Sequence, residues 1–265
     1  MKIAIIGAGN MGGAVARGLA QGSVVKRSDI YISNPSTPKL EALKSDYPEI
    51  NVTTNNREAA AAADIIILAV KPWKVEEVLR EILPHVDYSR QAIASMVGGL
   101  GIVQLSEWLD KGDGVLPATY LIIPNTAIAT MSSMTFIAST RSTAEQDAHL
   151  LKIFNELGEA MLVEESLIPV GTSLASCGIA YALRYIRAAM EGGVELGFRA
   201  DDAKRIVMQT LRGAADILAA NGSHPEAEID RVTTPGGLTI KGLNAMEAAG
   251  FTTSVIEGLK ASTKR

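Results

Sequence analysis

The 265-residue chain has little cysteine, histidine or aromatic side chain: one Cys, three His, and 5% Phe, Trp and Tyr together. A single cysteine, Cys177, excludes an internal disulfide framework and a four-cysteine metal site, and it is typical of a protein of the reducing cytosol. His85, His149 and His224 lie far apart in the sequence, and none has the spacing of zinc ligands. We therefore expect no metal site.

An excess of positive charge is also missing. Lys and Arg number 25 against 29 Asp and Glu, a net charge of −4, whereas general binders of nucleic acids or anionic membranes need a basic surface. The longest aliphatic run, residues 65–70, has the length of a strand and not of a membrane span. We expect a soluble, cytoplasmic protein that binds neither nucleic acid nor membrane. Its mean hydropathy of +0.17 fits either a large subunit interface or an aliphatic-rich core.

The hydrophobic pattern divides the chain into two parts. Short runs that are apolar on both faces alternate with helical periodicity in the first part, which is typical of a parallel sheet covered by helices on both sides. We predict strands at residues 2–6, 29–33, 51–54, 64–70, 91–96, 119–124, 133–138 and 160–163, and helices at 9–21, 38–47, 58–63, 74–83, 102–108 and 143–157. The second part is helical, with segments at 167–196, 199–221, 238–249 and 253–260. The predicted domains are a nucleotide-binding α/β domain over 1–162 and an all-helical domain over 163–265.

A glycine motif, Gly-Ala-Gly-Asn-Met-Gly at residues 7–12, directly follows the first predicted strand and opens the first predicted helix. In this context the three glycines serve a tight turn, close approach of the backbone to a pyrophosphate, and packing of helix on strand. The helix N-terminus offers free N–H groups to the phosphates. The motif predicts a dinucleotide site; the alternative is a tight turn without a ligand.

The end of the second predicted strand indicates which dinucleotide is bound. An NAD site has Asp or Glu there for the ribose 2′-hydroxyl, but this chain continues with Asn34, Ser36 and Thr37, and Lys39 follows. Hydroxyl groups, the Asn34 amide and the Lys39 ammonium can all donate to a 2′-phosphate. We therefore favour NADP over NAD; the alternative is an ordinary loop with turn-forming residues.

Three later strands end at the same sheet edge, where open α/β sheets bind ligands. They end in Ala-Val-Lys-Pro at 69–72, Ser-Met-Val-Gly-Gly at 95–99 and Ile-Pro-Asn-Thr at 123–126. Small residues and amides such as Asn125 suit a nicotinamide ribose. Lys71 is either a cofactor contact or a solvated loop charge.

The helical part contains Val-Thr-Thr-Pro-Gly-Gly-Leu-Thr-Ile at residues 232–240. The N–H groups of Gly237, Leu238 and Thr239 would form an anion pocket at a helix N-terminus, which suits a carboxylate. The Thr234 and Thr239 hydroxyls can bond an anion or a ring nitrogen. A capped turn is the alternative.

These segments resemble the pyrroline-5-carboxylate reductase family over essentially the whole chain. The similarity is carried by residues 6–12, 69–72, 124–126 and 180–181, and above all by 233–240, which resembles the family's Ser-Pro-Gly-Gly-x-Thr block. It implies a Rossmann-type doubly wound domain followed by an all-α dimerisation domain. It also implies hydride transfer from NADPH, or NADH, to the imine carbon of 1-pyrroline-5-carboxylate, giving L-proline.

The resemblance also assigns roles to residues. Thr239 matches the threonine that hydrogen-bonds the ring nitrogen, Gly236, Gly237 and Leu238 match the carboxylate-binding backbone, and Glu165 matches a substrate-side acid; Thr234 replaces the usual Ser. With Ser36 and Asn125 from the reasoning above, the predicted cofactor residues are Gly7, Ala8, Gly9, Asn10, Met11, Gly12, Asn34, Ser36, Ala69, Val70, Lys71, Pro72, Met96, Val97, Gly98 and Asn125.

The chain departs from the family's pattern at Leu121, Ala127, Cys177, Ile179 and Arg231. These departures concern the shape of the substrate pocket more than the cofactor site. They keep two alternatives open: a reductase of another cyclic imine or small carbonyl acid, and a non-catalytic NADP-binding regulator. The helix at 167–196 contains no lysine, which argues against a hydroxy-acid dehydrogenase. Members of the family are dimers, often assembled into decamers, so we expect a homo-oligomer.

Overall fold

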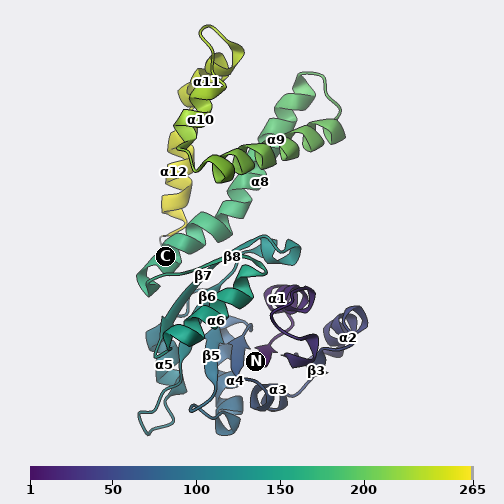
Figure 1. The fold of residues 1–265 in the computed structure, drawn as a ribbon, viewed down its shortest axis with the longest axis vertical. Coiled ribbons are helices and arrows are strands. Elements are labelled where there is room, and N and C mark those ends of the chain that lie inside the picture. Colours follow the sequence, from purple (N-terminus) through teal and green to yellow (C-terminus); the bar gives the residue numbers. More distant parts are fainter. Residues whose placement is uncertain (264–265) are drawn as a thin grey trace. The chain divides into compact units, whose positions relative to one another are not determined.

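The computed structural model describes residues 1–263, which fall into two compact units, one spanning Met1–Ser176 and one beginning at Cys177. The first unit is built on an eight-stranded sheet and the second is helical (Figure 1). The sequence predicts a boundary after residue 162, whereas the structure divides the chain after Ser176. Residues 163–176 stay with the first unit because the Val163 N–H donates to the Ile137 carbonyl (2.9 Å) and Gly171 packs on the Phe136 ring.

The sheet has the order β3-β2-β1-β4-β5-β6-β7-β8, with β1 between β2 and β4. The strands from β1 to β6 run parallel, which confirms the predicted doubly wound Rossmann-type sheet. The carboxyl ends of these strands therefore share one edge. The strands are β1 (Ile3–Ile6), β2 (Ile30–Ser33), β3 (Asn51–Thr53), β4 (Ile65–Leu68), β5 (Ala92–Ser95), β6 (Thr119–Ile123), β7 (Ser133–Thr140) and β8 (Gly158–Leu162).

One neighbouring pair departs from the expected all-parallel arrangement. β7 runs antiparallel to β6, and β8 then pairs parallel with β7. The connection between β6 and β7 holds only the short 3-10 helix η4 (Thr126–Thr130). A crossover to a parallel strand needs about a dozen residues or more, so this shorter connection makes a reversal.

Helices cover both faces of the sheet, which explains why the central strands β1 and β4 carry no polar side chain. Along β1, Ile3 and Ile5 enter one core while Ala4 and Ile6 enter the other, as the two-residue alternation of a strand requires. The first unit's longer helices are α1 (Asn10–Gln21), α2 (Thr37–Asp46), α3 (Asn56–Ala62), α4 (Val75–Ile82), α5 (Ile102–Leu109) and α6 (Ala144–Asn155).

A continuous helical stretch leads from the first unit into the second. It starts as η5 (Glu165–Leu167) and α7 (Ile168–Gly171), widens to π-helix over Thr172–Cys177, and goes on as α8 (Gly178–Glu195). The sequence predicts one long helix here but not its π segment. Four helices follow: α9 (Ala200–Asn221), α10 (Pro225–Arg231), α11 (Leu238–Ala248) and α12 (Phe251–Ala261). The seven-residue α10 is absent from the sequence prediction.

The second unit exposes much apolar surface. Within its described helices, Ala203 alone is buried. An apolar groove of about 820 Å³ lies along α8 and α12, lined by Tyr181, Tyr185, Phe251 and Val255 among others. Residues 165–195 are long and apolar enough to cross a membrane by length and composition, and 11% of their apolar 18-residue window is buried. A surface of this kind marks an interaction site.

Candidate functional site

The β1–α1 loop is wedged between the ends of β2 and β4, and only glycine fits its first position. The Gly7 N–H donates to the Ser33 carbonyl (2.8 Å), and Gly7 has a φ of +111°. A Cβ there would lie 2.6 Å from the Ala69 carbonyl oxygen. The loop thus makes the tight turn that the sequence predicts for the first glycine.

The other two glycines of the motif meet different surroundings. A Cβ on Gly12 would lie 2.0 Å from the Gly7 carbonyl oxygen, so α1 packs directly on its own loop. A Cβ on Gly9 would meet no atom within 4 Å. Gly9 is also the N-cap of α1, and no side chain in the described part of the protein caps this helix. Free N–H groups beside an open backbone fit the pyrophosphate of a dinucleotide.

Asn34 ties the β1 and β2 loops together. Its Oδ1 accepts from the Ala8 N–H (3.1 Å), and its Nδ2 donates to the Ser36 carbonyl and hydroxyl (both 3.0 Å). The sequence predicts the Asn34 amide as a donor to a 2′-phosphate, but the structure engages that amide with Ser36. Asn34 therefore holds the shape of the site.

A cavity of about 530 Å³ lies beside the second glycine and is lined by Gly9, Asn10, Arg17, Pro38 and Lys39 among others. Two of these side chains are cations. The Arg17 guanidinium is exposed and lies 3.8 Å from the Asp46 carboxylate. Arg17 is absent from the predicted cofactor residues, although its spacing of eight from Gly9 places both residues along one side of α1.

The ends of β4 and β5 complete the carboxyl edge. The Ala69 N–H donates to the Ile6 carbonyl and the Met96 N–H to the Leu68 carbonyl (both 2.9 Å). These bonds place the predicted segment 69–72 beside the glycine loop and the predicted segment 96–98 one strand further along the same edge. A Cβ on Gly98 would meet no atom within 4 Å, and Lys71 is exposed without a side-chain bond to any other described residue.

Asn125 stabilises the backbone at the end of β6. Its Oδ1 accepts from the Ala127 N–H (3.0 Å), and its Nδ2 donates to the Ala175 carbonyl (3.4 Å). It is 5% exposed. Its assignment as a cofactor contact remains a prediction.

In the second unit, the α10–α11 loop presents a helix N-terminus to solvent. Gly236 has a φ of +71°, and the Gly237 N–H donates to the Thr234 carbonyl (2.9 Å). Gly237 caps α11 with no side-chain acceptor among the described residues. Leu238 and Thr239 follow as exposed residues of the first turn. The loop therefore presents the N–H groups of Leu238 and Thr239 to an anion, whereas the predicted N–H of Gly237 is bonded to the Thr234 carbonyl.

The corner between α9 and α10, residues 221–231, precedes this loop and is stabilised by a carboxylate. Glu228 accepts from Asn221 (3.1 Å), from Arg231 (2.7 Å) and from the Ser223 hydroxyl. The Ser223 and Asn221 hydrogen bonds hold the pKa of Glu228 below its usual range. Arg231, one of the departures from the family pattern, is thus part of this corner.

Glu165, the predicted substrate-side acid, belongs to the first unit, whereas Thr234, Gly236, Gly237, Leu238 and Thr239 belong to the second. The Glu165 Oε1 accepts from the Ile102 N–H (2.7 Å) at the start of α5. Of the other departures, Leu121 is a core residue of β6 with 1% exposure, and Cys177 and Ile179 are half-buried.

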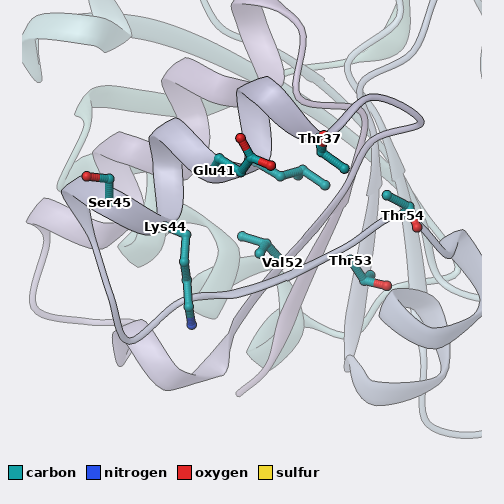
Figure 2. A pocket seen from close by; sticks show the side chains of 8 residues that line it. Thr37, Glu41, Lys44, Ser45, Val52, Thr53 and Thr54 are labelled. Carbon is teal, nitrogen blue, oxygen red and sulfur yellow. The ribbon is translucent and has the colours of Figure 1, made fainter.

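A second hollow of about 620 Å³ lies between α2 and the edge strand β3 (Figure 2). Two of its polar side chains already have partners: Lys44 Nζ donates to the Ile50 carbonyl and the Thr53 hydroxyl to Glu58 (both 2.7 Å). Because this hollow faces the outer edge of the sheet, it does not continue the site around the glycine loop.

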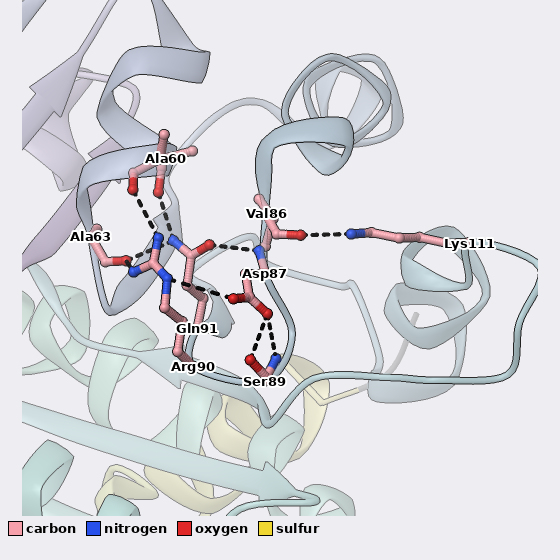
Figure 3. Close-up of polar contacts among 9 residues, drawn as sticks. Ala60, Ala63, Val86, Asp87, Ser89, Arg90, Gln91 and Lys111 are labelled. Carbon is pink, nitrogen blue, oxygen red and sulfur yellow. Dashed lines mark hydrogen bonds and ion pairs between the residues drawn. The ribbon is translucent and has the colours of Figure 1, made fainter.

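A polar cluster before β5 fastens that strand to the end of α3 (Figure 3). The buried Gln91 donates to the Ala60 and Ala63 carbonyls (2.8 and 2.6 Å) and accepts from the Asp87 N–H (2.8 Å). Hydrogen bonds from the Ser89 hydroxyl and N–H lower the pKa of Asp87. Each of these groups already makes a hydrogen bond within the fold, so the cluster has a structural role.

Comparison with known proteins gives matches over both units. A family model described as pyrroline-5-carboxylate reductase dimerisation matches residues 165–265. A model described as NADP oxidoreductase coenzyme F420-dependent matches residues 2–98.

Individual relatives match this chain over all or nearly all of its length. Pyrroline-5-carboxylate reductase 2 of Dictyostelium discoideum is 40% identical over 277 residues, covering 100% of this chain and 91% of that protein. Pyrroline-5-carboxylate reductase 1 of the same organism is 39% identical over 275 residues, or 99% of this chain, which spans 49% of that protein's length. The crystal structure of Plasmodium falciparum pyrroline carboxylate reductase with NADP bound matches with a TM-score of 0.86 at 26% identity, covering 99% of this chain and 95% of that one.

Proposed function

The chain belongs to the pyrroline-5-carboxylate reductase family, and we propose that the two loop systems described above divide its reaction between them. The reaction is the NAD(P)H-dependent reduction of 1-pyrroline-5-carboxylate to L-proline, the last step of proline biosynthesis. In our proposal the carboxyl edge around Gly7, Gly9 and Gly12 binds NADPH, and the loop at 234–239 binds the substrate.

The N-terminus of α11 holds the substrate carboxylate in this proposal. Its N–H groups at Leu238 and Thr239 lack a side-chain cap among the described residues, whereas the Gly237 N–H is taken by the Thr234 carbonyl. Such a terminus favours an anion by its dipole. The Thr239 hydroxyl, on the same turn, orients the ring nitrogen by a hydrogen bond or relays its proton. The imine carbon is electrophilic when the ring nitrogen is protonated. These groups therefore need only position the ring and keep the proton on the nitrogen. Positioning of this kind supplies roughly 7–11 kcal/mol of a barrier.

NADPH, when bound, supplies the hydride that reaches the imine carbon. The residues of the first unit hold and orient it. The open backbone at Gly9 admits the pyrophosphate. Residues 69–72 beside the glycine loop, and residues 96–98 one strand further along the edge, would hold the nicotinamide half.

The observation that carries the substrate assignment is the uncapped α11 N-terminus, and 1-pyrroline tests it. This compound has the same imine ring without the carboxylate. We expect its kcat/KM to be about a hundredfold lower than that of 1-pyrroline-5-carboxylate, since two hydrogen bonds to a charged group are lost. Steady-state NADPH oxidation with both compounds gives the ratio. Equal kcat/KM values would mean that no part of the chain recognises the carboxylate.

Lys39 selects NADPH over NADH in our proposal. It lines the cavity beside Gly9 together with Arg17, and the end of β2 carries no carboxylate that would repel a 2′-phosphate. Lys39→Glu should lower the ratio of kcat/KM for NADPH to that for NADH by about tenfold or more, because an attraction becomes a repulsion. Lys26→Glu, with the same charge change before β2, is the control and should keep the wild-type ratio. An unchanged ratio in Lys39→Glu would contradict the assignment.

The protein functions as a homo-oligomer. We propose that a second copy covers the groove along α8 and α12, and that the resulting dimer is the unit of a decamer. The dimerisation model matches this part of the chain, and the exposed apolar stretch 165–195 is then covered by protein and not by lipid. We also propose a cytoplasmic location, which a single free cysteine favours, and no nucleic-acid partner.

A further inference from the structure

The loop that joins β5 to α5, residues 96–101, is held at its two ends by side-chain oxygens. At its start, the buried Ser95 hydroxyl accepts from the Val97 N–H (3.2 Å). At its end, the Glu165 Oε1 accepts from the Ile102 N–H (2.7 Å). The second acceptor comes from a distant segment of the chain, so the loop's position depends on where Glu165 is held.

The interior of this loop is rich in glycine, although its Val97 and Leu100 side chains are buried in the core. Three of its residues are glycines, and Gly99 has a φ of +83°. A Cβ on Gly98 would meet no atom within 4 Å, and the turn bond from the Leu100 N–H to the Val97 carbonyl is long, at 3.4 Å. Glycine-rich backbone loses more entropy on ordering than other backbone. The side-chain anchors at the two ends offset part of that entropy cost.

Glu165 acts as the missing cap of α5. The helix begins at Ile102, and its N-cap Gly101 has no side chain that could accept from the first turn. A carboxylate at a helix N-terminus makes a charge-assisted hydrogen bond and interacts favourably with the helix dipole. Glu165 itself is fixed, since it opens η5, where the Leu167 N–H donates to the Glu164 carbonyl (2.9 Å).

We propose that Glu165 is a positioning residue for the cofactor: it holds the β5–α5 loop against which NADPH binds. The proposal rests on the assignment of Met96–Gly98 to the cofactor site. It differs from the resemblance, which places Glu165 beside the substrate. The two roles predict different kinetic changes, because a loop anchor affects NADPH affinity and a substrate contact affects the KM for the imine.

Glu165→Ala and Glu165→Gln separate the roles. Gln keeps an oxygen that can accept from the Ile102 N–H and loses only the charge, whereas Ala loses the acceptor. We expect Glu165→Ala to raise the Kd for NADPH about five- to tenfold, in line with the loss of one half-exposed hydrogen bond. The KM for 1-pyrroline-5-carboxylate should stay within about twofold. Glu165→Gln should stay within about twofold of wild type in both constants.

The Kd is measured by NADPH fluorescence without substrate, so the result does not depend on turnover and separates this proposal from the proposed function. Glu164→Ala is the matched control, since this neighbouring carboxylate is exposed. If Glu165→Ala does not fold, Glu165→Asp, which keeps the charge but withdraws the oxygen, should show the same rise in Kd. An unchanged Kd in the folded variant, or an equal rise in substrate KM for Ala and Gln, would overturn the proposal.

Discussion

Gly12→Ala should lose NADPH affinity by on the order of a hundredfold. The added Cβ would lie 2.0 Å from the Gly7 carbonyl oxygen and 2.9 Å from the Ala69 Cβ, and the first of these neighbours is backbone. Either α1 or the β1 loop must move, and displacing a binding group by about 1 Å can cost a factor of a hundred. NADPH fluorescence titration measures the loss, and circular dichroism shows whether the fold is kept.

Gly9→Ala and Gly213→Ala are the variants to compare with Gly12→Ala. A Cβ on Gly9 meets no protein atom within 4 Å, so Gly9→Ala should fold like wild type. It should nevertheless bind NADPH at least about tenfold more weakly, because the methyl group occupies space that the pyrophosphate needs. Gly213→Ala lies in the interior of α9 with equally open surroundings and should keep wild-type affinity. Wild-type affinity in both Gly9→Ala and Gly12→Ala would contradict the dinucleotide site.

Thr239→Ala should lower kcat by between a few-fold and a few hundredfold while the Kd for NADPH stays unchanged. The hydroxyl stands on the first turn of α11, beside the N–H groups assigned to the carboxylate, and its removal leaves the ring nitrogen without its partner. Steady-state kinetics together with a separate NADPH titration distinguish loss of turnover from loss of cofactor binding.

Thr239→Ser is the conservative partner of this variant. It keeps the hydroxyl and should retain most of the turnover, whereas a purely packing role for the threonine methyl group would make Ser and Ala equally poor. Turnover in Thr239→Ala equal to that of wild type would remove Thr239 from the mechanism.

Much of the dinucleotide unit could be predicted from the sequence, because its signals are local. The aliphatic run at 65–70 becomes β4, and the glycine spacing gives the loop at Gly7, Gly9 and Gly12. The break at Pro235 likewise falls between α10 and α11. In each case one short segment contains both the pattern and its cause.

The features that the sequence did not predict depend on distant partners. β8 begins at Gly158, two residues before the predicted start, because this glycine fits where a Cβ would lie 2.1 Å from the Ser133 carbonyl oxygen. Asn34 turns inward because the Ala8 N–H and Ser36 meet it. Glu165 caps α5 from a segment that periodicity assigns to the other domain. Contacts such as these follow from the packed fold, not from a local motif.

The reductase activity itself is tested by NADPH oxidation with the purified protein and 1-pyrroline-5-carboxylate, with the product identified. We predict substrate-dependent oxidation, one L-proline formed per NADPH consumed, and a kcat/KM for NADPH above that for NADH. Tight NADPH binding without formation of proline would contradict the reductase activity, and only the assignment of the dinucleotide site would be retained.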